Sequence, residues 1–164
     1  MERTTLRAMV AASALCAAPL PAVAEGALSF TFDGASIEFV AQLEGARTGF
    51  TRFASVDAVS IEGVQGQARL VLELALPPGA RTGDAPHDAR ISYRPDGFRD
   101  YWVSPSDVPE GAVIVELLDL SGPSPRISGQ FSVPLCFTRT PVHMPDLSRC
   151  LPAHGQFDTA LMRD

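Results

Sequence analysis

The sequence predicts a single all-β domain, either an antiparallel β-sandwich of about nine strands or, as the alternative, a closed β-barrel. Three observations support this class. Apolar and polar residues alternate with a period of two in much of the chain after Glu25, Gly, Pro and Asp clusters separate the alternating segments, and helical periodicity is hard to find. The 164 residues, 46% of them hydrophobic, suffice for one domain with a core, which we assign to residues 25–164.

The first 24 residues have the composition of a cleaved secretory signal peptide. Arg3 and Arg7 form a basic start, an uncharged Ala-rich run follows from Ala8 to Leu20, and the segment 21–24 ends in an A-x-A cleavage site. A membrane anchor is the alternative, but prolines interrupt the apolar run, which is too short to span a hydrocarbon layer. We therefore expect cleavage after Ala24 and a mature chain that is periplasmic or secreted.

A two-residue turn, Asp33-Gly34, predicts the register of the first hairpin. The predicted cross-strand pairs are Phe32 with Ala35, Phe30 with Ile37 and Leu28 with Phe39. Each pair is apolar on both sides, and a slip by one residue would turn all of them toward solvent. Turn chemistry and hydrophobic pattern therefore indicate the same hairpin.

The clearest later strand carries leucine at every second position. Its four leucines share one face, which we expect in the core, whereas Arg69 and Glu73 lie on the other face. These leucines are Leu70, Leu72, Leu74 and Leu76. The remaining predicted strands are approximately 52–62, 89–94, 98–103, 112–118, 127–135 and 156–162.

The most informative cluster of side chains lies in the hairpin 89–103. Its turn, residues 94–98, fits a type I turn followed by a left-handed glycine bulge. That register places four side chains on one face: Arg90, Arg94, Phe98 and Trp102. Because guanidinium groups stack on aromatic rings, this face is a candidate ligand-binding platform. Two other interpretations stay open, an outer sheet face with cation–π and Arg–Asp pairs, or a core Trp102 with the register shifted by the bulge.

Removal of the signal peptide removes Cys16 and leaves two cysteines, Cys136 and Cys150. An even pair in an exported chain predicts a disulfide, to which the chain-entropy model assigns about 3 kcal/mol for a loop of this length. A two-cysteine metal or redox site is the alternative, but it would normally use a closer spacing such as C-x-x-C.

A short repeat flanks the predicted disulfide loop, with Gly-Gln-Phe at 129–131 and again at 155–157. Every second residue from each Phe continues one face, namely Phe131, Val133 and Leu135 in one copy and Phe157, Thr159 and Leu161 in the other. We therefore expect two equivalent core strands, with the glycines at bulges or close backbone approaches.

The sequence contains no recognisable catalytic or cofactor-binding motif. G-x-S-x-G, H-E-x-x-H, C-x-x-C, the EF-hand pattern and G-x-G-x-x-G do not occur, and the complete lack of Lys excludes Schiff-base chemistry and the Walker A loop. His143-Met144 near Asp146 could supply copper ligands, but two adjacent ligands do not complete a coordination shell. We expect no metal and no cofactor.

These features favour an exported, non-enzymatic protein with a binding or structural role in the bacterial cell envelope. The expected partner is an unknown ligand or an envelope protein. Nucleic acid is disfavoured by the net charge of −6, and no membrane span is expected in the mature chain. The alternative is a hydrolase with a site built from loop carboxylates and a histidine, which a cleft gathering His87 or His154 with two Asp would favour.

We predict that the mature protein starts at Glu25 and contains no free thiol, because the cleavage site precedes that residue and the remaining cysteines are paired. Intact-mass measurement of exported material, with and without an alkylating reagent, checks both points. A mass that retains residues 1–24, or two thiols that alkylate without reductant, would contradict the prediction.

Overall fold

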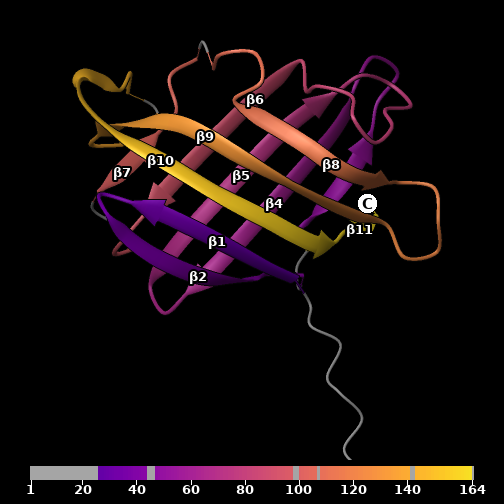
Figure 1. The fold of residues 1–164 in the computed structure, drawn as a ribbon, viewed down its shortest axis with the longest axis horizontal. Helices are drawn as coiled ribbons and strands as arrows, with labels where there is room; N and C mark the ends of the chain where they lie inside the picture. Colours follow the sequence, from indigo (N-terminus) through magenta and orange to yellow (C-terminus); the bar gives the residue numbers. More distant parts are fainter. Residues whose placement is uncertain (1–25, 44–46, 98–99, 107, 141–142, 164) are drawn as a thin grey trace, which may run out of the picture.

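The computed structural model describes residues 26–43, 47–97, 100–106, 108–140 and 143–163, and the regular structure in these ranges is all β-strand (Figure 1). The predicted signal peptide lies outside the described residues. The strands are β1 Gly26–Phe32, β2 Ala35–Ala41, β3 Gly49–Arg52, β4 Asp57–Gln65, β5 Ala68–Leu76, β6 Asp88–Arg94, β7 Tyr101–Val103, β8 Val113–Asp119, β9 Arg126–Thr138, β10 Asp146–Ala160 and β11 Met162–Arg163.

Eight of the strands close into an antiparallel barrel in the order β4-β2-β1-β10-β9-β7-β6-β5, with β5 pairing back onto β4. Two of the three extra strands, β3 and β8, lie where one long strand has two neighbours along the same edge. β4 pairs with β3 near its start and with β2 near its end, and β9 pairs with β8 near its start and with β7 near its end. β11 adds to β3 as a parallel strand. The all-β prediction is confirmed, and the architecture is the closed barrel rather than the sandwich.

The first hairpin has the predicted register. Phe32 pairs with Ala35, Phe30 with Ile37 and Leu28 with Phe39 between β1 and β2. Both turn residues have positive φ, 49° at Asp33 and 77° at Gly34, which is the conformation that a type I′ turn requires and that favours an Asp-Gly sequence. The backbone twist of this turn matches the twist of the two strands it connects.

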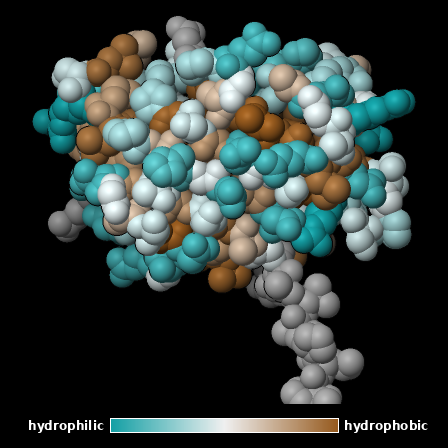
Figure 2. Space-filling model, viewed as in Figure 1, coloured by the Kyte–Doolittle hydropathy of each residue, from teal (hydrophilic) through white to brown (hydrophobic). Residues whose placement is uncertain are grey.

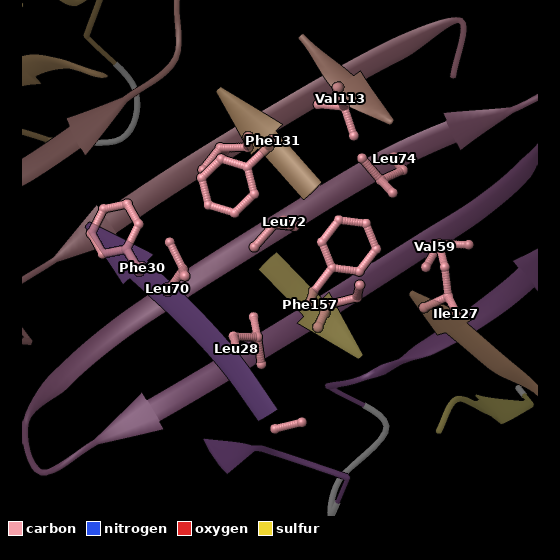
Figure 3. Packing of buried hydrophobic residues seen from close by; sticks show 14 of the residues in the cluster. Leu28, Phe30, Val59, Leu70, Leu72, Leu74, Val113, Ile127, Phe131 and Phe157 are labelled. Atoms are coloured by element: carbon pink, nitrogen blue, oxygen red, sulfur yellow. The ribbon is translucent and has the colours of Figure 1, made fainter. Parts of the chain in front are cut away.

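Inward-pointing side chains fill the barrel (Figure 3). The four leucines of β5 are at most 2% exposed, as the alternating pattern predicts. In Figure 3, Leu70 and Leu72 lie among the rings of Phe30, Phe131 and Phe157, which come from β1, β9 and β10. An eight-stranded barrel is just wide enough for side chains to fill its interior.

The repeated Gly-Gln-Phe sequences face each other across β9 and β10. Phe131 pairs with Gly155, and Phe157 pairs with Gly129. A Cβ atom at either glycine would lie 2.7 Å from the Cζ atom of the Phe on the other strand. Each glycine therefore provides the space that the opposite ring occupies, which confirms the prediction of close approaches in two equivalent core strands.

Two predicted strands have wrong boundaries. The predicted strand 52–62 is interrupted, because the chain turns after β3 with a hydrogen bond from the Phe53 amide to the Val56 carbonyl (2.9 Å). The buried carboxylate of Asp57 holds this turn, since it accepts hydrogen bonds from Arg52 Nε (3.1 Å) and from the Gly79 amide (3.0 Å). The predicted strand 156–162 is the end of the much longer β10, followed by β11.

We predict that Leu72→Ala lowers the free energy of unfolding by about 2–5 kcal/mol, because Leu72 is fully buried and the surrounding side chains would fill only part of the cavity that the substitution leaves. Glu73→Ala, on the exposed face of the same strand, should change it by less than about 0.5 kcal/mol. Denaturant unfolding curves of the two variants test this parity. Equal losses at both positions would mean that β5 is buried on both faces.

Candidate functional site

The predicted register of the second hairpin is wrong. Trp102 pairs with Tyr93, and Val103 pairs with Ser92, instead of Trp102 with Arg90. The connection between β6 and β7 is longer than the predicted turn, and β7 also pairs with β9, where Trp102 lies opposite Phe137. This second pairing turns each side chain of β7 to the face opposite to the one that the turn predicts.

The four residues of the predicted platform consequently do not share a face. Trp102 lies on the inner face opposite the buried Tyr93, whereas Arg90 and Arg94 point outward from β6. The Arg94 guanidinium lies over the Tyr101 ring, 5.4 Å from its centroid. Phe98 lies outside the described residues. Trp102 packs against the core but is only partly buried, so the arrangement resembles the alternative of a core tryptophan with a shifted register without full burial of the ring.

Trp102 lies in the middle of a row of three aromatic rings. Its ring centroid is 5.0 Å from that of Phe32 and 5.6 Å from that of Phe137, both in edge-to-face geometry. The Arg149 guanidinium covers the outer end of this row, 4.0 Å from the Phe137 centroid. Rings in this geometry attract one another and attract a cation over the ring face. The row therefore attaches the chain around Arg149 to the barrel core.

The chain that this row attaches is the best candidate for a functional surface. The predicted Cys136–Cys150 disulfide is present and joins β9 to β10 at directly paired positions. We call residues 143–149 the stapled segment, because the disulfide closes its base. Its first residues turn back over the outer face of β6 and β7, where Met144 lines a depression of about 320 Å³ together with Arg90 and Val103.

Short-range hydrogen bonds give the stapled segment a defined shape. The Asp146 carboxylate accepts hydrogen bonds from the Ser148 hydroxyl (2.6 Å) and the Ser148 amide (3.0 Å), and these bonds lower the pKa of Asp146. The Thr138 hydroxyl faces the carbonyl oxygens of Thr140 (2.9 Å) and His143 (3.3 Å). Local side-chain to backbone bonds of this kind hold turns in one conformation.

Met144 and Leu147 are 91% and 70% exposed, the highest values among the large hydrophobic residues that the structure describes. Sequence reasoning considered Met144 only as a copper ligand beside His143. The His143 Nδ1 atom instead contacts the Thr140 hydroxyl, and the described residues contain no group of three or more His, Cys, Asp or Glu placed to hold a metal ion. The signal that could have identified the surface was an apolar residue on each side of Pro145-Asp146 in a disulfide-closed loop.

The residues of the hydrolase alternative are distributed over two surfaces. His87 lines a wide depression of about 690 Å³ together with Asp88 and Glu110, whereas His154 lines a separate depression together with Glu38. Among the described residues, none of these side chains hydrogen-bonds to another of the set. General acid–base catalysis is favoured by a histidine that a second group orients, and these described residues make no such hydrogen bond with one another.

No protein-family model matches the chain, and neither the curated proteins nor the solved structures include a match to it. The described part of the chain contains no helix with the length and apolarity needed to cross a membrane.

We predict that Phe137→Ala shifts the fluorescence of Trp102, the only tryptophan, to longer wavelength and increases its quenching by acrylamide. The substitution removes one of the two rings that shield the indole, along with the surface under Arg149. The free energy of unfolding should fall by about 1–3 kcal/mol, since Phe137 is only partly buried. Leu117→Ala, an exposed residue of β8, serves as the control that leaves both the emission and the quenching unchanged. An unchanged emission in Phe137→Ala would contradict the packing of this row.

Proposed function

We propose that this protein is exported and acts as a non-enzymatic binding module of the cell envelope, which docks a partner protein through the stapled segment. The observation that carries the proposal is the pair Met144 and Leu147, two highly exposed apolar side chains on a segment held by a disulfide. Exposed apolar groups that the fold does not use are typical of protein-interaction surfaces.

The rigidity of the segment favours tight docking. Burying a Met or Leu side chain contributes about 1.5–3 kcal/mol in transfer free energy, but a flexible loop would lose part of this gain when it becomes ordered. The Cys136–Cys150 bond, the Asp146–Ser148 turn and the Arg149–Phe137 stack order the segment before it meets a partner. More of the burial energy therefore remains as affinity.

The charges around the apolar pair suggest the chemistry of the partner. Arg139 and Arg149 are exposed and line one depression of about 340 Å³ with Met144, and Asp146 is the acidic residue among its lining residues. These two arginines lie on a chain whose net charge is −6. A fitting partner has an apolar pocket bordered by carboxylates.

Two features support export. Residues 1–24 have the order of a signal peptide, with a basic start, an apolar run and an A-x-A site. The disulfide is of the kind that persists in oxidising compartments such as the periplasm or the extracellular medium. We accordingly place the proposed partner in the envelope or outside the cell.

The hydrolase stays the second candidate because His87, Asp88 and Glu110 line the same depression. We rank it below the binding module, since these groups lack the hydrogen bonds among themselves that orient a catalytic base in the described part of the chain. Retained activity of a His87→Ala variant on any substrate found for the protein would exclude this site.

We predict that Met144→Ser/Leu147→Ser weakens partner binding and leaves the fold intact, because both side chains point into solvent in the free protein. The wild-type protein, immobilised, is offered an envelope extract, and each protein retained is purified and titrated against the variants. The double substitution should weaken its binding by at least about tenfold, which is the loss expected from about 1.4 kcal/mol of missing apolar burial.

A matched double variant, Leu117→Ser/Met162→Ser, changes the same residue types at exposed positions outside the stapled segment and should bind like the wild type. Cys136→Ser/Cys150→Ser should weaken binding as well, since it releases the base of the segment. A partner that binds the Met144→Ser/Leu147→Ser variant with unchanged affinity would rule out the stapled segment as the docking surface.

A further inference from the structure

A second surface, separate from the stapled segment, lies on the outer face of the barrel. A shallow depression of about 430 Å³ extends over the strands β2, β1, β10 and β9, and Ala112 and Ile114 border it on the side of β8. Figure 1 shows β1, β10, β9 and β8 in succession across the near side of the molecule, and Figure 2 shows that this side is predominantly hydrophilic or intermediate in hydropathy, with scattered apolar residues.

The strand register arranges the outward side chains of this depression in two rows that cross the four strands. The first row consists of Glu38, Ser29, Gln156 and Gln130, and the second of Ser36, Thr31, His154 and Ser132. Each strand thus contributes one side chain to each row. We call this surface the two-row groove.

The two-row groove offers mainly uncharged hydrogen-bonding groups. Apart from Glu38 and His154, its row residues carry hydroxyl or amide groups, which both donate and accept. Thr31 and Ser36 pair with each other (3.1 Å), and Gln130 donates to Glu116 (2.9 Å). Within the described chain, the other row side chains have no hydrogen-bond partner, so their capacity is available to a ligand.

The outer face on β5 and β6 has a different composition. There the outward positions of β5 include Arg69 and Glu73. The outward positions of β6 include Asp88, Arg90 and Arg94. The low charge of the two-row groove is therefore not a property of the whole barrel surface. Among the described residues the lining of the groove includes no Arg, and the chain has no Lys, so apart from His154 the groove offers no side chain of the kind that binds a phosphate, sulfate or carboxylate group.

We propose that the two-row groove binds a linear, neutral oligosaccharide that lies across the strands between the rows. Hydroxyl and amide groups match the hydroxyl groups of such a ligand, and Ile114, which is 48% exposed, offers an apolar surface to the C–H groups of one sugar ring. Neighbouring strands are about 4.8 Å apart, a spacing close to the length of a pyranose ring. One sugar residue per strand gives a site for about four units.

The experiment is a two-dimensional NMR titration of the ¹⁵N-labelled mature protein with gluco-, manno-, galacto- and chito-oligosaccharides of one to six units. The expected result is that the amide shifts of β1, β9 and β10 around the groove respond to at least one series, with affinity that rises up to about four units and then levels off. Sulfated and uronic-acid oligosaccharides of the same lengths should bind more weakly.

Gln156→Ala should weaken saccharide binding about three- to tenfold, the usual effect of losing hydrogen bonds to one side chain. Gln67→Ala, a matched substitution at an exposed turn position outside the groove, should leave binding unchanged. Met144→Ser/Leu147→Ser should also bind saccharide like the wild type, so a failure of the docking proposal is distinguishable from a failure of this one.

Three results of the titration of the wild-type protein would overturn the inference, and a fourth comes from the variant. They are no response to any neutral series at millimolar concentration, a response confined to residues outside the groove, and tighter binding of the anionic series. Equal binding by Gln156→Ala and the wild type would likewise show that the rows do not hold the ligand.

Discussion

The pairing of β9 with β10 is the interaction on which the other features depend. Twelve residue pairs join these two strands, the longest in the barrel. Their inner faces carry Phe131 and Phe157, each of which fits the space left by a glycine on the opposite strand. Their outer faces carry the middle of the two-row groove, and the disulfide at one end closes the stapled segment. A slip of one of these strands by one residue would turn its inner side chains outward and its outer side chains inward, and it would also separate the two cysteines.

Features with local signals could be predicted from the sequence. The Asp33-Gly34 turn determines its own conformation and with it the register of β1 and β2. The alternation along β5 identifies its buried face because the side-chain period of a strand is two, whatever the strand pairs with. The disulfide could be predicted from the even number of cysteines and the expected export of the chain, and the two cysteines lie opposite each other in β9 and β10.

Features determined by distant pairing could not be predicted. The turn at 94–98 predicted one parity for Trp102, but β7 pairs with Phe137 and Cys136 of β9, and this contact determines the other parity. The choice between sandwich and barrel depends on how β4 meets β2, where only Val40–Val64 and Ala41–Gly63 are paired. The groove was missed for the same reason, since its Ser, Thr and Gln side chains are ordinary singly and form rows only through the register of strands distant in sequence.

The packed interior explains why both proposed surfaces lie outside the barrel. Small barrels either enclose a ligand or fill with side chains, and here the rings of Phe30, Phe131 and Phe157 occupy the interior together with leucines from β5. The proposed recognition and the stability of the fold therefore depend on alternating residues of the same strands. Phe131 and Phe157 stabilise the core, while their neighbours Gln130 and Gln156 face solvent. Because the inward and the outward residues of a strand make separate contacts, the outward residues can change at little cost in stability.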